Sequence, residues 1–283
     1  MQKYSGMQEP TLNLSACQRK QRRQRTADQA FRMGNFAKAL VLRVFLFKGC
    51  RVLELGSGPG TNILKYESSA PSFVAFVDVD ETALQDTRVR LSGRRGQPTA
   101  LAAYQVVNWD FSANYLPMEL IVAQPYDVAV AFYSLQYIGR SVEAGRQFFI
   151  NINTLLGTNG ILLAIVPNAE RLRAARVPGS LFNVSFSADD SGGSYQGYRF
   201  QVKGRAPFQE HTLQIEDLVE LAAPNFVLQY AAPMERVVSQ FSQQYAVLSA
   251  SLRKTMLQGD QLSDAESELF NLYDVLIFFR NKA

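Results

Sequence analysis

Apolar runs alternate with amphipathic stretches along most of this 283-residue chain. Short, continuous runs of Val, Leu, Ile, Phe and Ala are typical of strands that helices cover on both faces. Runs with helical spacing fall between them, and this alternation predicts βαβ units around a parallel sheet. The predicted strands are Val52–Leu55, Phe73–Val77, Leu101–Val107, Tyr126–Phe132, Ile161–Val166, Phe226–Gln229 and Tyr273–Phe279. We therefore expect an α/β fold with a seven-stranded, mostly parallel sheet and helices on both of its faces.

The helical spacing predicts the connections between these strands. The expected helices are Thr26–Phe47, one through Ile63 and Tyr66, Glu81–Leu91, Val142–Leu156, Ile215–Ala222, residues 234–257 and a short helix from Ser263. A turn-rich stretch at about 170–206 breaks the rhythm and predicts an inserted β-hairpin region near the substrate. The last strand is expected to close the sheet antiparallel at one edge. We expect a single domain over 26–283, after an N-terminal arm over 1–25.

Basic residues are concentrated near the N-terminus. The formal net charge is +4 with an isoelectric point near 9.0, which favours anionic partners. The basic residues within 1–25 include Arg19, Lys20, Arg22, Arg23 and Arg25. Three interpretations stay open: a disordered, solvated arm, an arm that contacts RNA phosphates, and a nuclear import signal. Two cysteines make no disulfide framework, and no apolar run approaches the length of a membrane span.

A glycine-rich loop follows the first predicted strand. The spacing is G-x-G-x-G through Gly56, Gly58 and Gly60, and a strand, a tight loop and a helix N-terminus in this order are typical of nucleotide-like ligand sites. Thr61 stands where a dinucleotide fingerprint would have its third glycine. Glu54 precedes the loop, where a carboxylate attracts a cationic ligand and repels a pyrophosphate. These two features favour a sulfonium methyl donor over NAD, although an NAD oxidoreductase stays as a minor alternative.

Two aspartates end the next two strands. Asp78 follows the second strand, where a carboxylate accepts hydrogen bonds from a ribose diol. Asp110 follows the third strand, where its carboxylate would meet an adenine amino group. Because the carboxyl ends of parallel strands meet at one edge of a sheet, we expect the glycine loop and both aspartates to line one nucleoside pocket.

The order of motifs resembles that of the eukaryotic and viral mRNA cap guanine-N7 methyltransferases. The resemblance covers most of residues 18–280 and rests on several segments. They are the basic stretch Arg19–Arg25, Gly34–Lys38, Leu53–Gly56 with Leu64–Tyr66, Val77–Val79 with Arg88–Arg90, Phe132–Tyr137, Pro207–His211 and Tyr273. The resemblance implies a Rossmann-like methyltransferase fold, S-adenosyl-L-methionine as cofactor and S-adenosyl-L-homocysteine as product.

The resemblance also implies a role for individual residues. The methyl donor would be held by Lys38, Glu54, Gly56, Gly58, Gly60, Asp78, Val79, Asp110, Phe111 and Phe132. The cap guanine and its phosphates would be bound by Asn35, Arg90, Tyr133, Gln136, Tyr137, Glu210 and Tyr273. No metal is expected. Expected partners are capped RNA and a guanylyltransferase, triphosphatase or RNA polymerase, with a monomeric enzyme in the nucleus, or in the cytoplasm if the chain is viral.

The chemistry suits these residue types. Guanine N7 carries a free lone pair, so methyl transfer needs orientation and electrostatics and no general base. Glu210 offers two acceptors to the two donors on the Watson–Crick edge of guanine, and adenine would leave it unpaired. The lone histidine, His211, is expected in a pocket wall or strand.

The chain departs from the family pattern at four positions. Pro59 replaces a basic residue in the glycine loop, Asn62 an acid after it, Gln136 a histidine in the aromatic turn, and Phe111 a small polar residue. Two alternatives therefore stay open: an inactive methyltransferase-like subunit that binds RNA or a partner, and a methyltransferase acting on another small molecule or RNA.

Overall fold

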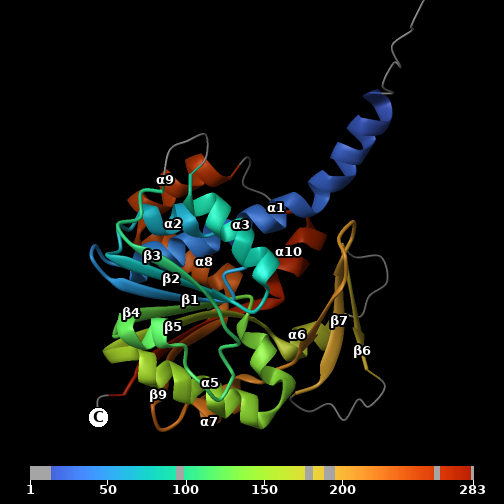
Figure 1. Cartoon of the computed structure of the whole chain (residues 1–283). Coiled ribbons are helices and arrows are strands. Elements are labelled where there is room, and N and C mark those ends of the chain that lie inside the picture. The colour runs from blue at the N-terminus through green and yellow to red at the C-terminus, as the bar shows by residue number, and fades with distance from the viewer. Residues whose placement is uncertain (1–13, 94–98, 176–180, 188–194, 258–261, 282–283) are drawn as a thin grey trace, which may run out of the picture.

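The computed structural model of the chain describes residues 14–93, 99–175, 181–187, 195–257 and 262–281, with side chains from Gln29 onward (Figure 1). Seven strands form the main sheet in the order β3-β2-β1-β4-β5-β10-β9. Their bounds are β1 Arg51–Leu55, β2 Phe73–Asp78, β3 Tyr104–Asn108, β4 Tyr126–Phe132, β5 Leu156–Pro167, β9 Phe226–Pro233 and β10 Tyr273–Arg280. The first five strands are parallel, and this confirms the predicted α/β class with a seven-stranded, mostly parallel sheet.

The last strand lies inside the sheet. β10 runs antiparallel between β5 and β9, with Val275 opposite Ile165 on one side and Ala232 on the other. The antiparallel direction agrees with the prediction, but the position at the edge is wrong, because β9 takes that place. Four consecutive side chains of β10 are nearly inaccessible to solvent, as expected for a strand paired along both sides.

Helices cover both faces of the sheet (Figure 1). One face packs against α1 Leu14–Phe45, α2 Ile63–Glu67, α3 Glu81–Leu91, α8 Met234–Gln244, α9 Ala246–Met256 and α10 Asp264–Asn271. The other face packs against α4 Met118–Ala123, α5 Val142–Leu155, α7 Ile215–Ala222 and the 3₁₀ helix η1 Leu135–Arg140. Among the described residues, no helix is long and apolar enough to cross a membrane.

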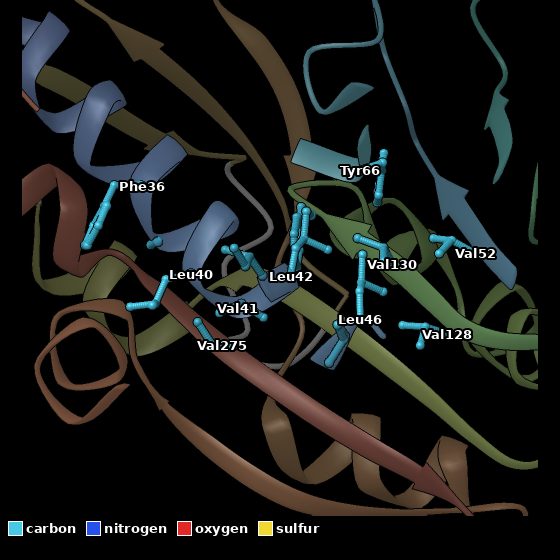
Figure 2. Packing of buried hydrophobic residues seen from close by; sticks show 14 of the residues in the cluster. Phe36, Leu40, Val41, Leu42, Leu46, Val52, Tyr66, Val128, Val130 and Val275 are labelled. Atoms are coloured by element: carbon cyan, nitrogen blue, oxygen red, sulfur yellow. The ribbon is translucent and has the colours of Figure 1, made fainter. Parts of the chain in front are cut away.

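Helix α1 forms the centre of the first core layer. Met33, Phe36, Leu40 and Val41 recur at helical spacing and are buried in the core beside the sheet, and Figure 2 shows the last three. Leu42 and Leu46 of the same segment belong to the same buried cluster as Val130 and Val128 of β4 (Figure 2). The apolar face of α1 therefore fixes this helix across the strands, and its other face is left for a ligand.

The predicted insertion is a small second sheet. β6 Phe182–Phe186, β7 Gly197–Val202 and β8 Phe208–His211 pair antiparallel, after the short helix α6 Ala169–Ala174. Alternate side chains of β7, including Tyr198 and Phe200, are buried against residues of α10 and α1. The sheet extends past the predicted limit of 206, and the predicted turn at 188–194 lies outside the described residues.

Three helix predictions differ from the structure. The first helix begins at Leu14 and not near Thr26, because Gln, Arg and Lys favour helix without an apolar stripe. The helix expected over 234–257 divides at Tyr245, whose φ and ψ of −120° and 52° are not helical. Helices α4, α6 and η1 were not expected, since each has only six residues, which is too short for a periodic signal.

We predict that the α1 interface carries a large share of the stability. Leu40→Ala leaves a cavity in a fully buried site and should lower the free energy of unfolding by about 2–5 kcal/mol. Val247→Ala, at a side chain of α9 that is 88% exposed, should change it by less than about 0.5 kcal/mol. Urea denaturation followed by circular dichroism measures both values. Similar losses for the two variants would contradict the central position of α1.

Candidate functional site

The glycine loop lies at the carboxyl end of β1, beside the turn that follows β4. Gly56 has a φ of +70°, and a Cβ atom on it would lie 2.3 Å from Cβ of Ser134. Only glycine allows this approach. The Ser134 hydroxyl donates a hydrogen bond to the Leu55 carbonyl at 2.7 Å and joins the two segments. A Cβ on Gly58 would meet no atom within 4 Å, which leaves open space beside the loop.

Asp78 fixes the loop from the end of β2. Its carboxylate accepts hydrogen bonds from the Gly58 amide at 2.7 Å and from the Asp80 amide at 2.9 Å. The Thr87 hydroxyl of α3 donates to the Gly58 carbonyl at 2.8 Å. Each carboxylate oxygen has two lone pairs, so both oxygens of the half-buried Asp78 keep acceptor capacity for a ligand. Val79, the next residue, is exposed beside it.

A buried charged cluster lies behind the loop. Glu54 accepts a hydrogen bond from the Asn62 amide at 2.6 Å through Oε1, and its buried Oε2 has no partner. Lys65 donates to the Asn62 side-chain oxygen at 3.0 Å. Burial raises the pKa of Glu54 to about 7, against the opposing effects of Asn62, Lys38, Lys65 and the nearby Tyr66 hydroxyl. A buried carboxylate oxygen without a partner costs free energy and marks a place where a cationic ligand fits.

Lys38 of α1 joins this cluster to the rest of the site. Its ammonium group lies 5.4 Å from the centre of the Tyr133 ring, and its charge interacts with Glu54. Burial lowers the pKa of Lys38, and Glu54 opposes this effect. Burial also lowers the pKa of Lys65, to about 7.

The carboxylate expected to meet adenine has partners within the chain. Asp110 accepts hydrogen bonds from the Ser112 hydroxyl at 2.6 Å and from Arg140 of η1 at 2.7 Å. These bonds lower its pKa although burial opposes the change. The Phe111 side chain packs edge-on against Phe148 in the core, and Phe132 is buried at the end of β4. Any ligand contact of Phe111 would therefore use its backbone.

A cavity of about 390 Å³ lies between α1, the aromatic turn after β4, α10 and the small sheet. Six of the seven predicted cap residues line it: Asn35, Tyr133, Gln136, Tyr137, Glu210 and Tyr273. Lys38 also lines it and so places the charged cluster at its wall. Residues that are distant in the sequence thus meet in one cavity, on elements that the core holds in place.

Glu210 is the carboxylate of this cavity. It is 6% exposed, and it accepts hydrogen bonds from Gln136 Nε2 at 2.9 Å and from the Tyr198 hydroxyl. Gln136 also donates to the Tyr133 carbonyl at 2.9 Å, and its buried Oε1 has no partner. Burial raises the pKa of Glu210, and its two hydrogen bonds oppose the change. The two donors fix the carboxylate and leave lone pairs on both of its oxygens.

Tyrosines form the wall between the charged cluster behind the glycine loop and Glu210. Tyr133 and Tyr273 meet edge to face with ring centres 4.9 Å apart. Tyr133 has a φ of +59°, a strained conformation for a residue with a side chain, and strain of this kind is common at binding sites. Burial, and then the negative charges of Glu210 and Asp78, raise the pKa of Tyr137 to about 12. Both carboxylates thus act on Tyr137, although they come from different strands.

Arg90 lies apart from the cavity of Glu210. With Arg32 and Lys65 it lines a separate groove between α1, α2 and α3, and Asn35 lines both spaces. The structure therefore groups Arg90 with the back of the glycine loop and not with the predicted guanine residues.

Several site residues were not identified from the sequence. Tyr198 supports Glu210, Arg140 pairs with Asp110, and Phe31 and Arg205 line the far end of the cavity. The alternation of Tyr198, Phe200 and Val202 indicates a strand with one buried face, but nothing in it points to Glu210. Among the described residues, no cluster of three or more His, Cys, Asp or Glu side chains could hold a metal ion.

Solved structures with this fold include methyltransferases. CcbJ methyltransferase from Streptomyces caelestis has a TM-score of 0.55 and 14% identity, over 87% of this chain and 90% of that one. An S-adenosylmethionine-dependent methyltransferase from Clostridium acetobutylicum has a TM-score of 0.50 and 13% identity, over 89% and 92%. At these identities the likeness establishes the fold alone.

Curated relatives are mRNA cap guanine-N(7) methyltransferases. The protein from Cryptococcus neoformans is 22% identical over 86% of this chain and 37% of its own length. Those from Saccharomyces cerevisiae and Arabidopsis thaliana are 24% and 21% identical, over 72% and 67% of this chain and 48% and 52% of their own lengths. The chain therefore spans about half or less of the length of these relatives.

A family model covers nearly the whole chain. The model of the mRNA (guanine-N(7))-methyltransferase domain matches residues 13–281. The match includes the glycine loop, the aromatic turn and the small sheet that carries Glu210. This chain therefore belongs to the mRNA (guanine-N(7))-methyltransferase domain family.

Proposed function

We propose that this chain transfers a methyl group from S-adenosyl-L-methionine to N7 of the guanine that caps RNA. The observation that carries the proposal is the buried Glu210, fixed by Gln136 and Tyr198 in a cavity whose wall includes Lys38 of the charged cluster. One cavity thus brings a carboxylate that suits guanine next to a group of charges that suits the methyl donor. The names of the relatives support the same activity.

The residues behind the glycine loop fit the methyl donor. Oε2 of Glu54 is buried without a partner, and Asp78 keeps acceptor capacity beside the open space at Gly58. We infer that Glu54 faces the cationic amino end of the donor, that Asp78 accepts from the ribose hydroxyls and that Lys38 faces its carboxylate. Asp110 would bind adenine through the oxygen capacity left by Ser112 and Arg140.

The residues of the cavity fit guanine. The free lone pairs of Glu210 suit the N1 and N2 donors of guanine. Adenine carries an acceptor at N1 and would leave Glu210 without its second bond. The rings of Tyr133, Tyr137 and Tyr273 supply the surfaces on which a purine stacks.

Methyl transfer to N7 depends on the orientation of the two reactants and on the electric field around them, and it needs no proton transfer. S-adenosyl-L-methionine, when bound, supplies an electrophilic methyl group on a sulfonium. The tyrosines and Glu210 would orient guanine so that N7 meets this group in line. The cluster of Glu54, Lys38 and Lys65 would set the field around the charge that is lost. Because N7 has a free lone pair, no side chain needs to accept a proton.

We predict that Glu210→Gln abolishes guanine recognition without harming the donor site. The amide places a donor where guanine also has one, so transfer to GpppA-capped RNA should fall by roughly two orders of magnitude or more. Affinity for S-adenosylhomocysteine, measured by calorimetry, should stay within about twofold.

The control is Glu220→Gln on the exposed face of α7, which should leave both measurements unchanged. If Glu210→Gln weakens donor binding, or methylates GpppA normally, Glu210 does not read guanine.

We predict that donor binding depends on the ionisation of Glu54. Below pH 7 the carboxyl is protonated and cannot attract a cation, so affinity should rise with pH. For a group that titrates near 7, affinity should increase about tenfold between pH 6 and pH 8. Calorimetry with S-adenosylhomocysteine across this range measures the effect. Glu54→Gln should bind more weakly with most of the pH dependence removed, and an unchanged profile in this variant would refute the assignment.

We infer that the basic residues at the start of α1 contact RNA phosphates, and that the chain acts on capped transcripts in the nucleus. Phosphate contacts add affinity without base choice. The test replaces Arg19, Lys20, Arg22, Arg23 and Arg25 by Gln, which preserves helix propensity. RNA affinity and its salt dependence should both fall, while transfer to the GpppA dinucleotide stays constant. If RNA affinity in the variant keeps the salt dependence of the wild type, this segment does not contact RNA and is a targeting signal or a solvated extension.

A further inference from the structure

The guanine cavity has two dissimilar ends, which the register of the small sheet separates. Glu210 lies opposite Tyr198, whereas Phe208 lies opposite Phe200, two residues nearer to the turn that carries Arg205. One end carries Glu210, Gln136 and the tyrosines described above. The other end is formed by apolar and aromatic side chains and one exposed cation, Arg205. The apolar wall residues of the cavity are Ala30, Phe31, Phe200, Val202, Phe208, Leu269 and Phe270. A guanine held by Glu210 leaves this end for the part of the ligand beyond the base.

Arg205 is held in place over an aromatic ring. Its guanidinium carbon lies 3.8 Å from the ring centre of Phe31 on α1. The turn between β7 and β8 is fixed by hydrogen bonds from the Arg205 amide to the Val202 carbonyl at 2.9 Å and from Gln201 to the Arg205 carbonyl. Gly204, with a φ of +85°, allows this turn. Stacking on Phe31 limits the motion of a long side chain and leaves its N–H groups free to donate.

No other cation on the cavity wall is available for an anion, among the described residues. Lys38 is buried, interacts with Glu54 and is assigned above to the carboxylate of the methyl donor, and Arg90 lines the separate groove behind the glycine loop. Pro59 gives the glycine loop no charge. Arg205 is exposed, and no described Asp or Glu forms a salt bridge with it.

We propose that Arg205 binds the phosphate bridge of the cap and makes the cavity select guanine nucleotides that carry phosphates over guanosine. This inference rests on the proposed function and adds a phosphate contact that Arg90 was expected to provide. The planar guanidinium matches two phosphate oxygens at once. Phe31 and the small sheet thus serve recognition by positioning this group, and the sheet supplies both Glu210 for the base and Arg205 for the phosphates.

The experiment compares ligands that differ in phosphate content. Guanosine, GTP and GpppA are titrated by calorimetry into the 283-residue chain saturated with S-adenosylhomocysteine, for the wild type, Arg205→Gln and Arg205→Lys. Arg205→Gln should weaken GTP and GpppA by about tenfold or more, as expected for a lost charge-assisted contact, and guanosine by less than about twofold. Arg205→Lys should recover part of the loss, because it keeps the charge without the planar fork.

Two further variants serve as matched controls. Lys203→Gln removes an exposed cation from the same turn that does not line the cavity, and it should have no effect that depends on phosphate. Arg90→Gln tests the other assignment. If Arg90→Gln shows the phosphate-dependent loss and Arg205→Gln does not, the inference is overturned. An equal loss for guanosine and GpppA in Arg205→Gln would also overturn it, because that pattern indicates damage to the cavity wall.

The outcome separates this inference from the proposed function. A wild-type chain that binds GpppA more tightly than guanosine, with the preference kept in Arg205→Gln, supports the proposed function and rejects Arg205. A folded wild-type chain that binds none of the three ligands rejects both.

Discussion

The packing of α1 across the sheet is the constraint on which the rest of the site depends. One face of this helix buries Phe36 and Leu40 in the core, and this burial fixes its rotation and position. The other face then places Phe31, Asn35 and Lys38 along the cavity wall. Phe31 contacts Arg205 of the small sheet, and Asn35 lines the cavity that holds Glu210. Lys38 interacts with Glu54. A helix held only by its ends would leave these contacts without a defined geometry.

Two buried carboxylates suit different ligands, and the groups around each one explain the difference. Glu54 has one hydrogen bond from Asn62, two lysines nearby and one oxygen without a partner, which suits a cationic ligand. Glu210 has a donor on each oxygen and faces aromatic side chains, which suits a neutral base with two donors. Glu210 is hydrogen-bonded by the protein and keeps a lone pair on each oxygen, whereas Glu54 has an oxygen without a hydrogen bond. Tyr133 and Lys38 lie between them, so that the two binding processes share one wall.

The sequence predicts the local parts of this structure and misses the parts that depend on packing between distant segments. The apolar runs predict the strands of the main sheet, including the ends of β1 and β2, and the glycine spacing predicts the loop. The family resemblance places six cap residues that the structure brings into one cavity. The position of β10 inside the sheet cannot be read locally, because pairing on one or both sides leaves the same apolar run. Likewise, Tyr198 and Arg205 show only strand alternation and a turn, since their partners Glu210 and Phe31 are set by the docking of the small sheet. The separation of Arg90 from the cavity follows from the tertiary fold alone.

The most direct test of the account is the position of the transferred methyl group. The chain is incubated with isotope-labelled S-adenosylmethionine and RNA that begins with GpppA, ApppA or an uncapped triphosphate, and the nuclease-released caps are analysed by mass spectrometry against 7-methylguanosine standards. The account predicts label in GpppA-capped RNA alone, all of it at guanine N7. Label at another atom, or equal label in ApppA-capped RNA, would contradict the reading of Glu210 as the guanine carboxylate. Binding of S-adenosylmethionine without transfer to any of these RNAs would contradict the proposed activity.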